Sequence, residues 1–396
     1  MNTLLTNIIS ILGLIVSTMT IYQIIHNRKK QRKEDYDDNF VKIRRNVVSN
    51  RLGIYRFRLK SKFLSKKFKI DDLPLLSLNN SILKEPVNID EINLSMASDI
   101  EPKLGKYRIR FGSYDKYSSA IMSKDKPNSF FSGRQYRLLD VDKKNLIFSC
   151  EEYKYFDKID FGASLVYESS KDFKKNKTPF FSKYKKIIKK IEKPSDYIIL
   201  TGIDTLTLLI NKNNDVRMIM HLRGEAETAY ASGTFHVIPA GEFQPSCYLP
   251  YSWEDDFSIT KNIMREFSEE IENKEEYNGE SGVPFNYNQE PFISMINAKS
   301  EGKFKLYYLG TGFDALSLQG EILTCAVFDE DTFHKIFPNV ITKNKEGEIM
   351  TDRNRWGRPF DKEVESYLKT NTLAACETIL KLVKRNLSFF VSEIVH

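Results

Sequence analysis

Apolar positions spaced four apart mark the most informative stretch of the chain, residues 258–273. Ile263, Phe267 and Ile271 fall on one side of a helix with 3.6 residues per turn. This stripe predicts a helix from residue 258 to residue 273 that packs its apolar side on a core. Beside the stripe lies the charged sequence Arg-Glu-Phe-Ser-Glu-Glu, at residues 265–270.

Short apolar runs separated by turn residues fill the chain after Pro194. Their length and β-branched content predict buried strands, and a helical pattern follows near the C-terminus. The expected strands cover residues 197–210, 216–221, 233–238, 304–309 and 320–328, with turns at 211–215 and 239–242 and a last helix at 361–387. This order predicts an α/β/α sandwich with a mixed sheet over residues 196–390.

The preceding residues 61–170 show another pattern, in which prolines separate runs rich in aromatic and β-branched residues. The runs 107–111, 135–141 and 146–150 predict strands, and the polar stretch 140–145 predicts a hairpin turn. We expect a strand-rich linker domain here. The chain as a whole is therefore expected to be an α+β protein.

An uncharged apolar run occupies residues 4–25, and lysines and arginines follow it rather than precede it. A helix of this run would be about 33 Å long, which is enough to cross a bilayer. The charge asymmetry predicts an uncleaved, single-pass transmembrane helix whose C-terminal side faces the cytoplasm. Ser10, Gly13 and Ser17 share one face of this helix. Such a face permits self-association in lipid, although single spans also tolerate small polar residues without it.

Composition and charge limit the classes of molecule that this chain is expected to bind. A hydrophobic fraction of 41% with 12% aromatic residues excludes a largely disordered protein. Much of the net charge of +7 is local, in a basic juxtamembrane segment at 28–60 and a Lys-rich bridge at 171–195. Both segments suit anionic membrane lipid, and both are also explained as solvated linkers. No signature of specific DNA or RNA binding accompanies them. The four cysteines are far apart, which argues against a zinc site or a disulfide framework and fits a reducing compartment.

Three carboxylates of the helix at 258–273 form the main candidate site. Glu266, Glu269 and Glu270 stand at positions i, i+3 and i+4, which are neighbours on a helix surface. Hard Mg²⁺, held by carboxylates, waters and phosphate oxygens, is the natural partner of such a cluster. A solvated acidic face with an Arg265–Glu269 pair is the alternative.

These residues and the order of elements resemble a Nudix domain, whose signature is G-x5-E-x7-R-E-U-x-E-E-x-G-U, with U an aliphatic residue. Residues 265–270 match the R-E-U-x-E-E part, with the bulky apolar Phe267 at the aliphatic position. The sequence His-Val-Ile-Pro-Ala-Gly at 236–241 is similar to the strand and Pro-Gly-Gly turn that precede the signature helix. The resemblance covers residues 196–390.

The resemblance implies Mg²⁺-dependent attack of water on a nucleoside-diphosphate-linked substrate. Glu266, Glu269 and Glu270 would hold the metal, and Glu269 and Glu270 would be the catalytic residues of an active enzyme. Arg265 would orient a carboxylate. A further acid or base often lies on a later loop in this family, and we expect Glu321 to take that place.

Two departures from the signature favour ligand binding over hydrolysis. Phe257 stands where the family has its first glutamate, so Arg265 loses its usual ion-pair partner. Glu272 stands where the family has a glycine at the helix end. Nudix folds are also used as ligand sensors, and these losses are compatible with a domain that binds a nucleotide without converting it.

A transmembrane helix, a linker domain and a Nudix domain in this order resemble the transmembrane-Nudix effectors of bacterial cyclic-oligonucleotide anti-phage signalling (CBASS). That resemblance implies a homo-oligomer in the bacterial inner membrane, which a cyclic nucleotide activates to disrupt the membrane. The expected ligand contacts are Arg223, Gly241, Glu242 and Arg358. Two other functions stay open, a membrane-tethered pyrophosphohydrolase and a non-enzymatic membrane scaffold.

Overall fold

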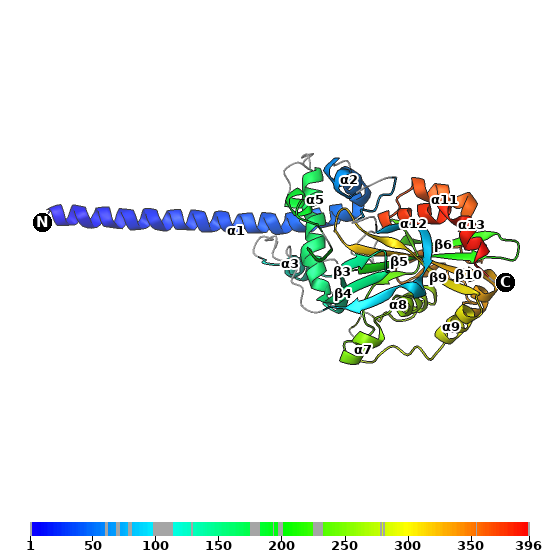
Figure 1. Cartoon of the computed structure of the whole chain (residues 1–396). Helices are drawn as coiled ribbons and strands as arrows, with labels where there is room; N and C mark the ends of the chain where they lie inside the picture. Colours follow the sequence, from blue (N-terminus) through cyan, green and yellow to red (C-terminus); the bar gives the residue numbers. More distant parts are fainter. Residues whose placement is uncertain are drawn as a thin grey trace.

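One long helix projects from a body that contains all the described strands, as the computed structural model of the chain shows (Figure 1). The structure describes residues 2–59, 62–68, 72–77, 81–97, 114–127, 130–174, 183–192, 194–196, 201–224, 233–277, 279, 282–353 and 355–394, and only the backbone of residues 2–14. Within these ranges no helix is long and apolar enough to cross a membrane. The side chains of residues 4–14, at the start of the expected span, lie outside the described set, and so does the expected strand 107–111.

The projecting helix, α1 (Asn2–Leu59), contains both the expected span and the basic segment at 28–60 up to its last residue. Its axis is interrupted at Asn50, whose φ of −127° and ψ of 19° are not helical. Phe40 is buried between the rings of Tyr117 and Tyr167, at centroid distances of 5.6 and 5.3 Å. These contacts fix the inner half of α1 on the body, while its N-terminal part extends away from it (Figure 1).

The body is built on one large mixed sheet. Its strand order is β1-β9-β10-β5-β6-β12-β11, with β7 and β13 pairing with β6, and β8 pairing with β5. Strands β10 and β5 are parallel, and the other pairs are antiparallel. The strands are β1 (Ile82–Asn88), β5 (Thr201–Ile210), β6 (Val216–Arg223), β7 (Phe235–Val237), β8 (Ala240–Glu242), β9 (Phe304–Phe313), β10 (Gly320–Asp329), β11 (Lys343–Asn344), β12 (Gly347–Met350) and β13 (Arg358–Pro359). The expected mixed sheet is therefore confirmed.

Helices cover both faces of this sheet, since α8 packs against β8 and β5, and α12 against β10, β5 and β7. The larger helices of this part are α7 (Pro250–Asp255), α8 (Ile259–Glu266), α9 (Phe292–Ser300), α10 (Glu330–Ile336), α11 (Phe360–Lys369), α12 (Ala374–Arg385) and α13 (Leu387–Ser392). The predicted stripe is confirmed as core, because Ile263, Phe267 and Ile271 are each at most 1% exposed. The ring of Phe267 packs edge-on against Phe328, at 5.6 Å between centroids.

Residues 61–170, where a strand-rich domain was expected, contribute strands to two different sheets. A small sheet has the order β2 (Asn93–Met96), β4 (Ile147–Lys154), β3 (Arg134–Asp142), and a turn at 143–146 joins β3 to β4 as the hairpin prediction requires. β1, however, is an edge strand of the large sheet, since it pairs with β9. The remaining helices are α2 (Lys62–Phe68), α3 (Tyr117–Lys124), α4 (Tyr155–Lys158), α5 (Ser164–Lys174) and α6 (Lys183–Ile188), with a wider helical turn at Ile159–Ala163 between α4 and α5. Part of the Lys-rich bridge, 175–182, lies outside the described residues.

Two local predictions were wrong. The expected helix at 361–387 is broken at residues 370–373, because the hydroxyls of Thr370 and Thr372 donate to the carbonyl of Tyr367 and end α11 there. The backbone of the break bonds with Phe235 of β7 instead: the N–H of Phe235 donates to the carbonyl of Asn371, and the N–H of Leu373 donates to the carbonyl of Phe235. The expected turn at 239–242 is strand β8, and this strand continues the sheet beside β5.

Candidate carboxylate site

The helix that carries the carboxylates begins where the sequence places it. The side chain of Ser258 accepts a hydrogen bond from the backbone N–H of Lys261 at 3.3 Å and caps α8. After Glu266 the helix widens into one turn of π-helix, Phe267–Ile271. Asn273, next to the Glu272 that replaces the family's glycine, adopts the left-handed conformation with a φ of 55°. Asparagine tolerates that conformation, so the helix ends without a glycine.

Strand β8 lies directly against the carboxylates. A Cβ atom on Gly241 would be 2.1 Å from Oε1 of Glu266, so only glycine leaves room for this carboxylate. The backbone N–H of the preceding residue, Ala240, donates to Oε1 of Glu270 at 3.0 Å. The Pro-Ala-Gly-Glu segment and the glutamate helix are therefore two sides of one site.

The site is buried rather than a solvated acidic face. Glu266 is 8% exposed and Glu270 4% exposed. Burial raises the pKa of each of these two carboxyls well above its ordinary value, and neighbouring glutamates raise it further. Burial also raises the pKa of Glu269, to about 7, against the lowering effects of Arg265 and of the hydrogen bond from the N–H of Tyr277. The cluster therefore favours bound protons or a bound cation over three free negative charges.

Arg265 is fully buried at the centre of a hydrogen-bond network. Its Nη2 donates to the carbonyl of Gln244 at 2.8 Å and to Oδ1 of Asn262 at 2.9 Å. Its Nε lies 3.6 Å from Oε1 of Glu269, as the i,i+4 spacing predicts. Burial alone would lower the pKa of Arg265, and the nearby Tyr287 and carboxylates together raise it above its ordinary value.

Asp256 reaches this arginine through a tyrosine. The hydroxyl of Tyr287 donates to Oδ1 of Asp256 at 2.8 Å, and Nη1 of Arg265 lies 3.4 Å from the same hydroxyl. Oδ2 of Asp256 accepts from the backbone N–H and the hydroxyl of Ser246, at 2.7 and 2.6 Å. Phe257, at the family's first glutamate position, packs instead on Tyr136, at 4.9 Å between ring centroids. The lost ion pair is thus replaced by a bridged contact.

Sequence reasoning missed three residues that border the carboxylates. Glu346 and Glu276 raise the pKa of Glu269 through their charges, and Asn344 donates to the backbone carbonyl of Glu270 at 3.0 Å. Two of them belong to the β11–β12 turn, which lies more than seventy residues from the helix in sequence. No local pattern links such distant positions, so the sequence contains no signal that would have identified Asn344 and Glu346.

The structure separates the two arginines that were expected to bind ligand. Arg223 lies at the cluster, with its Nη2 3.0 Å from Oε2 of Glu346 and its charge lowering the pKa of Glu270 against the larger effect of burial. Arg358 pairs with Met218, several residues back along β6, and its charge acts on Tyr367 of α11. Arg223 therefore belongs to the site, and Arg358 lies apart from it.

Glu242 and Glu321 form a second acidic group on the opposite face of the sheet. Both stand in register with Gly202 of β5, one on each side, and neighbouring residues of a strand point to opposite faces. A Cβ on Gly202 would lie 2.5 Å from Oε2 of Glu321. Lys158 of α4 makes an ion pair with Glu242. Burial raises the pKa of Glu321 well above its ordinary value, with Asp204 adding to the effect. Glu321 thus does not face the three helix carboxylates.

The donor chemistry of the helix site fits a hard divalent cation. Oε2 of Glu270 is buried and has no hydrogen-bond partner, and carboxylate oxygens are the ligands that Mg²⁺ prefers. In the described part of the chain, however, no three histidine, cysteine, aspartate or glutamate side chains are gathered as a ready metal-binding group.

Comparison with known proteins gives little. No protein-family description matches the chain, and no curated protein matches it. Among solved structures, it is similar to a NUDIX hydrolase from Alicyclobacillus acidocaldarius, with 12% sequence identity and a TM-score of 0.28. The similar region covers 50% of this chain and 96% of that one.

Proposed function

We propose that residues 196–390 form a Nudix-like ligand-binding domain, which takes a nucleotide together with a divalent cation at Glu266, Glu269 and Glu270. The observation that carries the proposal is the packing of Gly241 and Ala240 onto Glu266 and Glu270. This contact joins the two motifs of the Nudix resemblance, which are separate in sequence. A cation bound to the carboxylates would neutralise them and the phosphate oxygens of the ligand.

Binding without efficient turnover is the form of this function that the site favours. Two departures from the catalytic signature support this preference: Phe257 stands in place of the first glutamate, and Glu272 stands in place of the glycine at the helix end. The ion-pair partner of Arg265 is replaced by Tyr287, and Phe257 is part of an aromatic cluster. The protein's own groups would then bind and orient the ligand: Arg223 faces negative charge, and the N–H of Ala240 fixes Glu270.

The N-terminal helix suggests what binding controls. The uncharged run at residues 4–25 heads α1, and in the resemblance to CBASS effectors such a run is the membrane anchor. In this proposal the chain is a homo-oligomeric effector of the bacterial inner membrane with its C-terminal domains in the cytoplasm. A cyclic nucleotide would favour the clustered state only if it binds that state more tightly than the free one.

The test is a binding screen of the full chain in detergent against cyclic di- and trinucleotides, with and without Mg²⁺. We expect calorimetric binding that needs Mg²⁺ and is lost in Glu270→Gln, with no release of phosphate or mononucleotide. The absence of binding to every member of the screen would reject cyclic-nucleotide sensing. Release of a nucleoside monophosphate from a nucleoside-diphosphate-linked substrate, lost in Glu269→Gln, would instead favour the hydrolase.

One observation favours that second function, a membrane-tethered pyrophosphohydrolase. The pKa of Glu269 is raised to about 7 by burial, and a general base works best when its pKa is near the working pH. Glu269 lies in the site beside Arg265, where a water activated by the cation would need a proton acceptor.

A further inference from the structure

Strand β8 depends on contacts outside its sheet to stay in place. It is three residues long, and in the described part of the chain it pairs with one strand, β5. The same strand is one wall of the carboxylate site. Gly241 leaves room for the carboxylate of Glu266, and the N–H of Ala240 donates a hydrogen bond to its neighbour on the helix. Whatever fixes β8 therefore also fixes the geometry of the carboxylates.

The two residues after β8 bond both to the site helix and to the small sheet. On one side, Gln244 donates its N–H to Oδ1 of Asn262 at 3.2 Å, and its carbonyl accepts from Arg265 at 2.8 Å. On the other side, the N–H of Tyr136 in β3 donates to the carbonyl of Phe243 at 3.0 Å, and their rings pack at 4.5 Å between centroids. This segment is thus shared between the carboxylate site and the part of the chain that precedes Pro194.

Lys158, the last residue of α4, makes the contact to β8 itself. Its Nζ pairs with Oε1 of Glu242, and the two side chains are 14% and 26% exposed. The wide helical turn that follows is packed tightly on the loop after β9, because a Cβ on Gly162 would lie 2.6 Å from the carbonyl oxygen of Ser317. Nζ of Lys158 also lies 5.5 Å from the ring centre of Tyr155. The lysine is therefore held from its own side of the contact.

Glu242 needs this cation because a second carboxylate lies beside it. Glu321 leans over Gly202, where a Cβ would be 2.5 Å from its Oε2, and Gly202 is the residue of β5 that pairs with Glu242. Burial raises the pKa of Glu321, and the charge of Glu242 adds to this effect, whereas that of Lys158 opposes it. Oε2 of Glu242 is itself buried and has no hydrogen-bond partner. Without the lysine, the two carboxylates would repel each other across β5.

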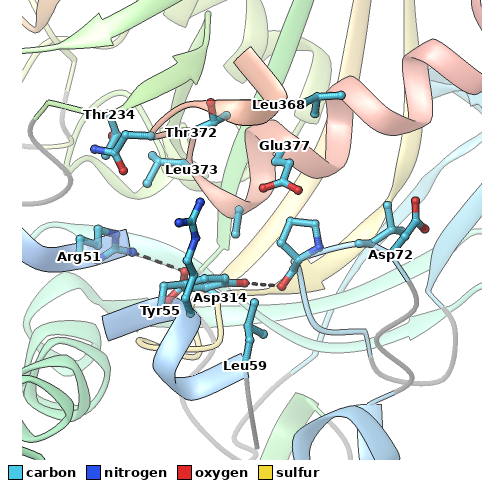
Figure 2. A pocket seen from close by; sticks show the side chains of 15 residues that line it. Arg51, Tyr55, Leu59, Asp72, Thr234, Asp314, Leu368, Thr372, Leu373 and Glu377 are labelled. Atoms are coloured by element: carbon cyan, nitrogen blue, oxygen red, sulfur yellow. Dashed lines mark hydrogen bonds and ion pairs between the residues drawn. The ribbon is translucent and has the colours of Figure 1, made fainter. Parts of the chain in front are cut away.

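Asp314, whose charge also raises the pKa of Glu321, has a cation of its own. Nη2 of Arg51, in the last part of α1, lies 3.4 Å from Oδ2 of Asp314, and Figure 2 shows this pair in the lining of a cavity of about 340 Å³. Both residues are only 6% exposed, so their pair is fixed by burial. The contacts therefore assign Arg51 to Asp314 and Lys158 to Glu242.

We propose that Lys158 is a positioning residue for the carboxylate site. Its ion pair with Glu242 keeps β8 against the sheet, and β8 in turn keeps its wall and its N–H donor on the glutamates of the signature helix. This role rests on the proposed function of those glutamates as a cation site. The part of the chain before Pro194 then contributes to cation binding without touching the cation.

The test measures Mg²⁺ binding to the full chain in detergent by calorimetry at pH 8, above the pKa of about 7 of Glu269. Lys158→Gln is expected to weaken binding about tenfold, as loss of a group that orients metal ligands does. Charge alone would have the opposite effect, because removing a positive charge tightens the binding of a cation. In the Glu242→Gln background, Lys158→Gln is expected to have no further effect. Unchanged or tighter binding in Lys158→Gln would overturn the positioning role.

The matched control is Arg44→Gln, which removes the same charge from an ion pair of similar exposure elsewhere in the chain. Arg44 and Asp125 are 15% and 24% exposed, and they join α1 to the residue after α3. The control is expected to leave Mg²⁺ binding unchanged. An equal loss of affinity in Arg44→Gln and Lys158→Gln would mean general destabilisation and would overturn the role.

Hydrogen–deuterium exchange in EDTA follows β8 without any cation. The peptide that covers residues 240–243 is expected to exchange faster in Lys158→Gln than in the unmodified chain or in Arg44→Gln. Equal exchange in the three proteins would overturn the positioning of β8 by Lys158. The absence of Mg²⁺ binding to the unmodified chain would reject the proposed cation site, and the exchange would then still decide whether Lys158 positions β8.

Discussion

The carboxylate of Glu266 occupies the position where a side chain on Gly241 would begin: a Cβ at position 241 would lie 2.1 Å from Oε1 and 2.2 Å from Cδ of Glu266. The contact joins strand β8 to helix α8. It gives a physical reason for glycine at this point of the Pro-Ala-Gly-Glu segment, because any other residue would have to displace the buried carboxylate of Glu266, which is 8% exposed.

Gly241→Ala is therefore expected to displace Glu266 and to damage both stability and cation binding. Overpacking of a buried contact typically costs about 1–3 kcal/mol, which chemical denaturation of the full chain would measure. The matched control is Gly282→Ala, whose nearest contacts would be with the exposed side chain of Tyr248, at 3.0 Å from its hydroxyl. Equal stability of the two variants would contradict the contact.

The carboxylates predict how stability depends on pH. The pKa of Glu269 rises from 4.5 to about 7 in the folded state, mainly by burial. The folded chain thus binds more protons than the unfolded chain in this range. The stability that protonated Glu269 contributes is therefore fully present below pH 4.5 and is lost as the pH rises toward 7. The loss from this group is on the order of 3 kcal/mol.

Chemical denaturation at several pH values in EDTA, compared between the unmodified chain and Glu269→Gln, measures that loss. The variant is expected to lose less stability between pH 4.5 and 7, because its amide does not titrate. Mg²⁺ added at pH 8 is expected to restore stability to the unmodified chain, since a cation replaces the missing protons. A parallel pH dependence of the two proteins would argue against a raised pKa at Glu269.

Local patterns were enough to predict the helix of the site and five strands of the large sheet, β5, β6, β7, β9 and β10. The stripe of Ile263, Phe267 and Ile271 depends only on helical periodicity, and it is buried as expected. The hairpin of β5 and β6 was visible because polar residues 211–215 separate two apolar runs. The pairing of Arg265 with Glu269 also follows from spacing within a single helix.

Contacts between distant segments could not be predicted in this way. Glu346 meets Arg223 because β12 pairs with β6, which places Gly347 opposite Arg223. Glu321 was expected at the carboxylates, but the strand register puts it beside Gly202 on the other face. The break between α11 and α12 arises from competition, since Phe235 of β7 takes the backbone groups that a continuous helix would use.

The hydroxyl of Tyr287 is expected to stabilise the fold through Arg265. Tyr287→Phe removes the group that joins Asp256 to the arginine and leaves a buried carboxylate with one partner fewer. The expected loss in the free energy of unfolding is about 1–3 kcal/mol. Tyr277→Phe is the control, because that ring packs on the same Phe285 and, in the described part of the chain, its hydroxyl makes no hydrogen bond. Similar losses in both variants would show that the bridge contributes nothing.

The N-terminal run is expected to act through self-association. Replacing Ser10, Gly13 and Ser17 together by leucine keeps the run apolar and removes its small-residue face. In cells that also contain an activating cyclic nucleotide, this variant is expected to abolish growth arrest and dye entry while nucleotide binding persists. Ile15→Leu is the control, as it changes an apolar residue to another. Killing by a chain without residues 4–25 would contradict a membrane effector.

Arg223 is expected to weaken the binding of the cation and to strengthen the binding of the nucleotide. Its charge lies beside Glu346 and Glu270, so it repels a divalent cation there and attracts a phosphate. Arg223→Gln should therefore tighten Mg²⁺ binding several-fold and weaken nucleotide binding by about tenfold, as calorimetric titrations of each would measure. Arg358→Gln serves as the control, because Arg358 lies beside Tyr367 and apart from the carboxylates, and it should change neither affinity. A loss of both affinities in Arg223→Gln would mean that Arg223 only maintains the fold, since a structural defect does not strengthen cation binding.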